Sequence, residues 1–381
     1  MRKLFGKFIT TLLMLTVVLS ASATFANEIV VGQINAQSGS GASLGRPLSI
    51  GAQIYIDRVN ANGGIKNRKI KLITLDDQFK EQKTAEHAEQ MLVSNNVIAL
   101  INTLGAPNID NLISSGYLDK HRLPVVGPLT NSSTARDRNS PHVFFVRAGL
   151  REEVNAMVKQ VDILGFKRVG IFYQNDTSGL DGVKMIQEAL ARKGISPVAI
   201  ASYERQDFKA DQASIVFKQA KPDVILTISI AAATTQLVKS LGRSISSGVM
   251  IIANSGNNPG VIMQELGTEL ARGLAIVQVM PSLTNTALPL VQEFLKDFSK
   301  YAPAGITADA ISLEGYISAK LLCIAIDRAK GAVDRQSIRI ALESIERLDL
   351  GGYVVDFGKE KRLGSSYAEV AVITGSGKLA R

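Results

Sequence analysis

The stretch from residue 28 to residue 77 constrains the fold of this chain more than any other segment. It opens with an apolar strand around Val30, continues through a glycine-rich turn, and then has the pattern of a helix. The sequence Asn-Ala-Asn-Gly-Gly-Ile at 60–65 turns the chain into a second strand, which ends at the paired aspartates Asp76 and Asp77. A strand, a helix and a second strand in this order predict a βαβ unit with parallel strands.

The rest of the chain repeats this alternation. Strands are expected at 28–34, 70–75, 97–101, 124–126, 143–147, 168–173, 196–203, 224–230, 250–253 and 274–279. Amphipathic helices are expected near 48–62, 84–94, 109–121, 154–164, 179–193, 210–219, 234–241, 261–266, 288–301 and 313–330. The alternation predicts an α/β fold with doubly wound parallel sheets, and 381 residues suit two lobes better than one core.

The first 26 residues have the pattern of an export signal. Arg2, Lys3 and Lys7 form a basic start, residues 8–19 form an apolar core, and small residues follow. We expect cleavage after Ala26. The apolar core is shorter than the roughly 20 residues of a membrane-spanning helix, so an uncleaved anchor is the less favoured alternative. The mature chain is therefore expected to be soluble and periplasmic.

Charge and cysteine content narrow the function. The formal charge of +9 falls to +6 when the three signal cations are removed, and the remaining charges are dispersed. Nucleic-acid binding needs a concentrated basic face, so it is not expected. Cys323, the only cysteine, lies in an apolar helical pattern, which predicts a buried and inert thiol. No cysteine follows the signal core, which argues against a lipid anchor.

Ligands of open α/β sheets collect at the carboxyl ends of the strands. The loops expected there are rich in Gly, Ser, Thr, Asn and Ala, which expose backbone amides or offer small polar groups. A carboxylate is held well by helix-end N–H groups of this kind. These loops are 37–45, 103–108, 129–134, 174–179, 229–234 and 254–258.

Several motifs in order resemble the type I periplasmic binding proteins of the leucine/isoleucine/valine-binding group. They are Asn-Ala-Asn-Gly-Gly-Ile at 60–65, the aspartates at 76–77, Leu-Pro-Val-Val-Gly-Pro at 123–128, Phe-Val-Arg at 145–147, Gln-Val-Met-Pro at 278–281 and Ser-Leu-Glu-Gly-Tyr at 312–316. The resemblance covers essentially the whole mature chain. It implies two lobes joined by three crossovers, with residues 27–147 plus about 281–362 in the first and 148–280 plus about 363–381 in the second.

The resemblance also implies ligand contacts in the first lobe. The turn that holds the ligand's carboxylate maps to 104–108, where Ala106 stands in place of the usual hydroxyl residue. Backbone amides of Gly105 and Ala106, or the side chain of Asn108, remain available there, and an ordinary turn is the alternative. The next contact element maps to Leu129, Thr130 and Asn131. Leu44 stands where an aromatic residue of the family lines the cleft.

The second lobe departs further from the family pattern. Ser178 replaces an aromatic residue, and Ser229 and Ile230 occupy a loop that usually offers another. Ser255 falls at an acidic position that can pair with a ligand's ammonium group. Burying an ammonium group without a paired carboxylate costs on the order of several kcal/mol. A free amino acid is therefore less assured as the ligand. Asp176 or Glu153 are the acids available to compensate.

Other chemistry finds little support in the sequence. Arg147 ends an expected strand at the first crossover and either binds an anion or braces the hinge with Glu152 or Glu153. The glycines at 39, 41 and 45 do not match a dinucleotide fingerprint. His87, His121 and His142 lack metal-ligand spacing, and Asp76 and Asp77 are expected to make structural hydrogen bonds. We expect no enzyme activity, no cofactor and no metal site.

The resemblance implies the extracytoplasmic solute-binding subunit of an ABC importer. The expected ligand is a small amino-acid-like solute or a carboxylate or amide, enclosed as the lobes close, and the expected partner is an ABC permease in the membrane. A monomer is expected. The alternative is a periplasmic ligand-sensing subunit for a membrane receptor.

Overall fold

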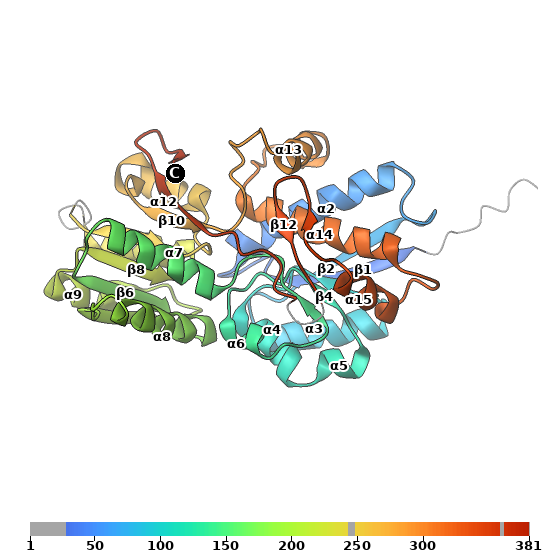
Figure 1. Ribbon diagram of the computed structural model, residues 1–381, viewed down its shortest axis with the longest axis horizontal. Helices are drawn as coiled ribbons and strands as arrows, with labels where there is room; N and C mark the ends of the chain where they lie inside the picture. The colour runs from blue at the N-terminus through green and yellow to red at the C-terminus, as the bar shows by residue number, and fades with distance from the viewer. Residues whose placement is uncertain (1–27, 243–247, 359–361, 381) are drawn as a thin grey trace, which may run out of the picture.

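The computed structural model describes residues 28–242, 248–358 and 362–380. Two α/β lobes lie side by side, one formed by the blue, cyan and orange segments and the other by the green and yellow segments (Figure 1). The export signal expected at 1–26 lies outside the described residues. Among the helices that are described, none is long and apolar enough to cross a membrane.

The first lobe contains a five-stranded sheet in the order β2-β1-β3-β4-β5, and all its neighbouring strands run parallel. Ile29 of β1 lies opposite Ile70 of β2, and Gly32 lies opposite Leu100 of β3. The nearly continuous burial of β1 is typical of a parallel sheet covered by helices on both faces. The strands are β1 (Ile29–Asn35), β2 (Ile70–Asp76), β3 (Leu100–Ile101), β4 (Val125–Val126) and β5 (Val143–Phe144).

Helices α2 and α14 pack closely against one another beside this sheet. The contact depends on two glycines: a Cβ at Gly51 would lie 1.8 Å from the carbonyl oxygen of Ser312, and one at Gly315 would lie 2.0 Å from that of Leu48. The helices of this lobe are α2 (Ala42–Ala61), α3 (Glu81–Val93), α4 (Ala106–Ser114), α5 (Tyr117–His121), α6 (Ser133–Asp137), α13 (Pro289–Tyr301), α14 (Ala310–Arg328) and α15 (Arg335–Glu343).

The second lobe contains a seven-stranded sheet in the order β14-β13-β10-β9-β8-β6-β7. Its strands are β6 (Val169–Gln174), β7 (Ala199–Tyr203), β8 (Val224–Ile228), β9 (Met250–Ala253), β10 (Ala275–Gln278), β13 (Glu369–Ile373) and β14 (Leu379–Ala380). The first five run parallel, whereas β13 and β14 are antiparallel to their neighbours. The helices are α7 (Leu150–Ile163), α8 (Thr177–Ala191), α9 (Asp211–Ala220), α10 (Ala231–Leu241) and α12 (Pro259–Ala271).

The chain passes between the lobes three times: between β5 and α7, between β10 and α13, and between a small hairpin and β13. The hairpin consists of β11 (Leu348–Asp349) and β12 (Val354–Val355). Two parallel-sheet lobes joined by three crossovers confirm the fold class expected from the sequence.

Some elements differ from the sequence-based expectation. The single helix expected at 109–121 is wrong, because the chain turns at Gly116 with a φ of +69° and divides the segment into α4 and α5. The strand expected at 143–147 forms a ladder only over β5. Helices α6 and α15 and strands β11 to β14 were not expected. Most of these strands are two residues long, which is too short for an alternating pattern.

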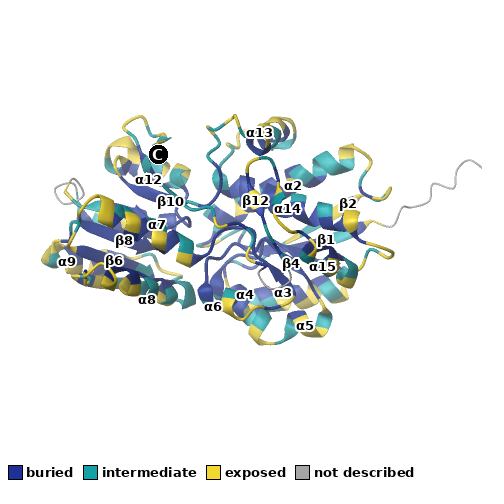
Figure 2. Ribbon diagram, in the orientation of Figure 1, coloured by how far each residue is buried: buried dark blue, intermediate teal, exposed yellow. Residues whose placement is uncertain are grey.

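Burial follows the layers of the two lobes, with the sheets dark and the outer faces of the helices exposed (Figure 2). Cys323 lies on α14 and is buried, as the sequence predicts. Desolvation raises the pKa of its thiol far above the ordinary value. The thiol therefore stays protonated and unreactive at neutral pH.

Candidate functional site

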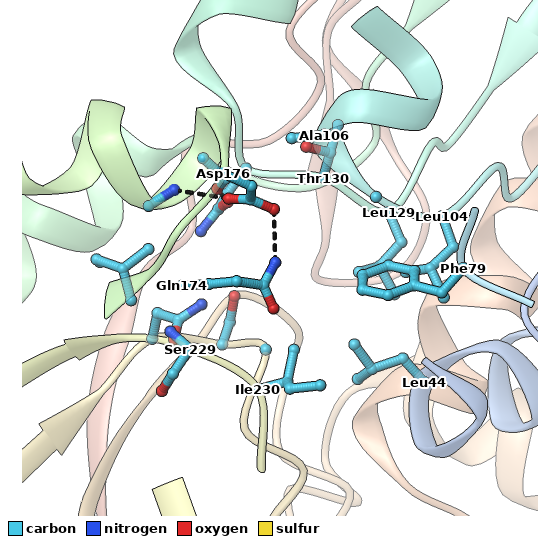
Figure 3. Close-up of a pocket in the computed structure, with 18 of the residues that line it drawn as sticks. Leu44, Phe79, Leu104, Ala106, Leu129, Thr130, Gln174, Asp176, Ser229 and Ile230 are labelled. Atoms are coloured by element: carbon cyan, nitrogen blue, oxygen red, sulfur yellow. Dashed lines mark hydrogen bonds between the residues drawn. The ribbon is translucent and has the colours of Figure 1, made fainter. Parts of the chain in front are cut away.

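A pocket of about 70 Å³ lies between the two lobes, and its lining includes residues at or just beyond the carboxyl ends of β3, β4, β6, β8 and β9. One end of the pocket is apolar, with Leu44, Phe79 and Leu104 gathered together, while Asp176, Gln174 and Ser229 lie at the other end (Figure 3). The full lining is Leu44, Phe79, Leu104, Gly105, Ala106, Leu129, Thr130, Asn131, Arg147, Gln174, Asp176, Ser178, Gly179, Ile228, Ser229, Ile230, Asn254, Ser255 and Gly256.

Every contact residue expected from the sequence lines this pocket except Asn108. The Asn108 side chain is buried one helical step away, where its Nδ2 donates to Asp77 Oδ2 at 3.1 Å and to Thr84 Oγ1 at 2.6 Å. Its Oδ1 accepts from Nη2 of Arg205 at 2.6 Å. Both the amide nitrogen and the amide oxygen of Asn108 thus have partners within the protein, and the residue does not line the pocket.

The N-terminus of α4 borders the pocket. Gly105 precedes this helix with a φ of +104°, a conformation that favours glycine, and its N–H donates to the Leu129 carbonyl at 3.1 Å. A Cβ at Gly105 would lie 2.7 Å from Arg205 Nη2. The first N–H groups of a helix lack partners within the helix, so the amide of Ala106 is available to an anion.

The loop after β4 adds hydroxyl and amide groups from the same lobe. Thr130 Oγ1 accepts from the Ser132 N–H at 3.1 Å. Asn131 bridges the lobes, because its Nδ2 donates to Glu153 Oε1 at 3.2 Å while its Oδ1 accepts from Ser178 Oγ at 2.6 Å. Asn131 therefore joins the first-lobe wall of the pocket to α7 and α8.

Asp176 is the acidic residue of the lining. Its Oδ1 accepts from the Gly179 N–H at 3.0 Å, which caps the N-terminus of α8, and its Oδ2 accepts from Gln174 Nε2 at 2.5 Å (Figure 3). Tyr203 in turn donates its hydroxyl proton to Gln174 Oε1 at 2.9 Å. Both carboxylate oxygens of Asp176 thus already have donors.

Arg147 is almost fully buried at the first crossover. Its Nη2 donates to Ser255 Oγ, its Nη1 lies 3.6 Å from Glu314 Oε2, and its Nη2 lies 4.0 Å from Glu153 Oε1. Glu153 also accepts from the Ser255 N–H at 2.7 Å. The contact with Glu153 agrees with the bracing interpretation, and Arg147 also lines the pocket, where the anion-binding alternative would place it. Glu152 instead accepts from the Gly149 N–H at 3.0 Å at the start of α7.

Glu314 is a member of this cluster that the sequence did not reveal. It lies in the second turn of α14, where one charge in a helical pattern resembles a solvent-facing residue. Burial raises its pKa, and the nearby Arg147 guanidinium opposes that rise. Phe79, three residues beyond the end of β2, was also missed. Leu104, Gln174 and Asn254 lie in the strand-end loops expected from the sequence, but they were not singled out there as ligand contacts.

Several contacts hold the lobes together around the pocket. Thr134 Oγ1 donates to Asp181 Oδ2 at 3.0 Å, and Asn258 Nδ2 donates to Asp309 Oδ2 at 2.6 Å. The loop after β7 reaches across from the second lobe, where Gln206 Nε2 donates to the Phe79 carbonyl at 3.3 Å. The structure is therefore a closed arrangement of the two lobes.

The aspartates at the end of β2 make structural hydrogen bonds, as expected. Asp76 Oδ1 accepts from the Gln37 N–H at 2.8 Å, and Asp77 Oδ1 accepts from the Phe79 N–H at 2.9 Å. Over the ranges 28–242, 248–358 and 362–380, no group of three or more His, Cys, Asp and Glu side chains is arranged to hold a metal ion.

The chain belongs to a family of periplasmic binding proteins, because the model of that family matches residues 28–378. These are solute-binding proteins rather than enzymes. Leu/Ile/Val-binding protein homolog 7 of Brucella suis is 21% identical over 358 residues, which cover 89% of this chain and 86% of the relative.

Solved structures agree with this assignment. A substrate-binding periplasmic protein from Ralstonia solanacearum has a TM-score of 0.88 at 30% identity, covering 92% of this chain and 99% of that protein. A possible leucine/isoleucine/valine-binding protein from Rhodopirellula baltica has a TM-score of 0.88 at 26% identity, covering 95% and 98%. The resemblance to the leucine/isoleucine/valine-binding group is confirmed.

Proposed function

We propose that this chain is the extracytoplasmic solute-binding subunit of an ABC importer and that it encloses a small carboxylate-bearing or amide-bearing ligand between its lobes. The observation that carries the proposal is the interlobe pocket, which has an apolar end and a polar end. The family works with ABC transporter permeases, so a permease in the membrane is the proposed partner. Cleavage after Ala26 would release a monomer into the periplasm.

The ligand's carboxylate would lie at the N-terminus of α4. The Ala106 amide, the positive end of the helix dipole and the Thr130 hydroxyl all favour a negative group there. The ligand's apolar part would pack on Leu44 and Phe79, which belong to the apolar end of the pocket. The proposed contact residues are those expected from the sequence, with Asn108 acting indirectly through its contact with Arg205.

Closure would be driven by contacts that the ligand makes with both lobes at once. A ligand shifts a conformational equilibrium only by its difference in affinity for the two states. Residues 27–147 with about 281–362 would move as one lobe, and residues 148–280 with about 363–381 as the other. The closed lobes would present one composite surface to the permease.

A thermal-shift screen of the mature protein tests the binding step. The panel contains amino acids, amides, short carboxylates, aromatic acids and sugars. A ligand at about 100 times its Kd stabilises the native state by roughly 2.7 kcal/mol. We expect a shift for a carboxylate or amide, and a shift for sugars alone would contradict the proposal.

A variant pair locates the site. Ala106→Glu places a carboxylate where the ligand's carboxylate is proposed to bind, so the thermal shift should disappear. Ala304→Glu adds the same charge at an exposed loop position and should leave the shift intact. The importer role is tested by uptake of the radiolabelled ligand after deletion of the gene. Unchanged uptake together with intact binding would favour the sensory alternative.

A further inference from the structure

A second, smaller cavity of about 20 Å³ adjoins the ligand pocket. Arg147 and Ser255 line both cavities, and Arg147 Nη2 donates a hydrogen bond to Ser255 Oγ. We call the smaller cavity the polar annex. It is lined by Arg147, Ser255, Asn257, Asn258, Pro259, Val277, Gln278, Val279, Met280, Ala310, Ile311 and Glu314. About 10–15 Å³ suffices for one water-sized group, so the annex has room for a single small polar group.

Three residues of the annex lining carry buried polar atoms without hydrogen-bond partners. In the part of the chain that the structure describes, these atoms are both carboxylate oxygens of Glu314, Nε of Arg147 and Oδ1 of Asn257. The oxygens accept hydrogen bonds, whereas the Arg147 Nε–H donates one. An unsatisfied buried polar atom costs about 1–3 kcal/mol, which favours a group that both donates and accepts.

The annex lies next to the proposed carboxylate position. Arg136 Nη2 donates to the Thr130 carbonyl at 3.3 Å and to the Arg147 carbonyl at 3.1 Å, so one guanidinium joins the two backbone segments. The pocket itself is small. Ala106, Thr130 and Arg147 line this same pocket, so a ligand carboxylate at Ala106 and Thr130 leaves the carbon beside it in a space that Arg147 also lines.

The charges at this end of the pocket disfavour an ammonium group. Arg147 and Asp176 are the charged side chains in the lining, and both oxygens of Asp176 already accept hydrogen bonds. An ammonium beside Arg147 would meet a like charge, and the two carboxylates nearest to it, those of Glu314 and Glu153, already lie 3.6 Å and 4.0 Å from the Arg147 guanidinium. A hydroxyl oxygen can accept from Arg147, and its proton can be donated to Glu314 or Asn257.

We propose that Arg147, Ser255 and Glu314 form a subsite for an uncharged hydroxyl group of the ligand. The protein would then prefer a 2-hydroxy carboxylate to the 2-amino carboxylate of the same carbon skeleton. This inference rests on the proposed function, because it takes the carboxylate to lie at the N-terminus of α4.

Calorimetric titration of the mature protein with matched ligands tests the subsite. The pairs are leucine with 2-hydroxy-4-methylpentanoate, valine with 2-hydroxy-3-methylbutanoate, and phenylalanine with 3-phenyllactate. We expect the hydroxy acid of at least one pair to bind about tenfold more tightly, which corresponds to about 1.4 kcal/mol. An amino acid that binds equally or more tightly overturns the subsite and leaves the proposed function standing. Binding of none of the six overturns the subsite and removes the carboxylate ligand from the proposed function.

Two variants separate the subsite from a general effect of charge. Ser255→Asp places an acid beside Arg147 and should lower the preference for the hydroxy acid about tenfold. Ala304→Asp adds the same charge at an exposed loop position outside the pocket, so the preference should persist. If thermal melting shows that Ser255→Asp does not fold, Glu314→Gln takes its place, since the amide offers a single acceptor oxygen and its own donors. An unchanged preference in the folded variant would overturn the role of the annex.

Discussion

The guanidinium carbon of Arg205 lies 3.7 Å from the centroid of the Phe79 ring, and the two residues belong to different lobes. The same guanidinium donates to Asn108, which in turn donates to the buried Asp77 carboxylate. Phe79 lines the apolar end of the pocket. Arg205 of the second lobe therefore contacts a residue of the pocket lining. Through Asn108 it is also linked to a buried acid of the first lobe.

Removal of this contact should speed ligand release. A cation–π contact contributes about 0.5–2 kcal/mol, and a hydrogen bond from a charged donor about 1.5–3 kcal/mol. We expect Arg205→Ala to raise the dissociation rate about tenfold or more, with a smaller change in the association rate. Stopped-flow fluorescence with the identified ligand measures both. Lys209→Ala, on the exposed part of the same loop, is the control, and equal dissociation rates in the two variants would contradict the role of Arg205.

Asn131 should matter for affinity more than for folding. Its side chain joins the first lobe to Glu153 and Ser178 of the second lobe, and Glu153 keeps the Ser255 N–H as a donor when the amide is removed. We expect Asn131→Ala to weaken binding by about 1–3 kcal/mol while the protein remains folded. Calorimetric titration and circular dichroism measure the two effects. Asn62→Ala at an exposed position is the control, and unchanged affinity in Asn131→Ala would remove this residue from the site.

Most of the fold could be predicted from the sequence because most strands and helices are long enough to show a periodic pattern of apolar residues. The strand β8 is apolar except for Thr227 and buried throughout, and α13 alternates apolar and polar positions at helical spacing. Elements such as β4 and β12 have two residues each, and their existence depends on neighbours in the sheet. Their pairing follows from tertiary structure that no local pattern encodes.

Site residues that follow the end of a strand could be predicted from the sequence. Site residues whose position depends on the packing of helices could not. Ala106 and Asn131 follow expected strands, so the rule that ligands bind at carboxyl ends of parallel strands found their loops. Asn108 lies only two residues beyond Ala106, but the turn of α4 directs its side chain to Asp77. Glu314 reaches Arg147 only because α14 packs across the first lobe. Such contacts between distant segments cannot be read from one sequence.

The α2–α14 contact should be intolerant of any added side chain. A Cβ at Gly51 would lie 1.8 Å from a backbone oxygen, and a backbone atom cannot swing aside as a flexible side chain can. We expect Gly51→Ala to lower the free energy of unfolding by roughly 3 kcal/mol or more, since overpacking of a tight core typically costs 1–3 kcal/mol. Urea unfolding measures the change. Gly375→Ala, whose added Cβ would have no neighbour closer than 3.8 Å, is the control and should unfold at the wild-type urea concentration.

Asp110 on α4 should make the protein less stable as the pH rises. Neither oxygen of its carboxylate has a hydrogen-bond partner among the residues described, and Arg138 Nε is 3.8 Å away. Burial raises its pKa from 3.8 to about 6, with Arg138 opposing the rise and Asp181 and Asp176 adding to it. Because the folded-state pKa is above the unfolded value, the folded state holds the proton more tightly. Stability is therefore lost as the pH rises from about 4 to about 6.

Asp110→Asn removes this cost of ionisation. The rise in the pKa from 3.8 to about 6 corresponds to nearly 3 kcal/mol, and screening by solvent and by the neighbouring Arg138 reduces the expected gain to about 1–2 kcal/mol at about pH 7.5. At about pH 4, where the wild-type carboxyl is largely protonated in the folded protein, the variant should gain much less. Urea unfolding at the two pH values measures the difference, with the exposed Asp327→Asn as the control. An equal gain at both pH values would show that the substitution acts through packing rather than through the charge of Asp110.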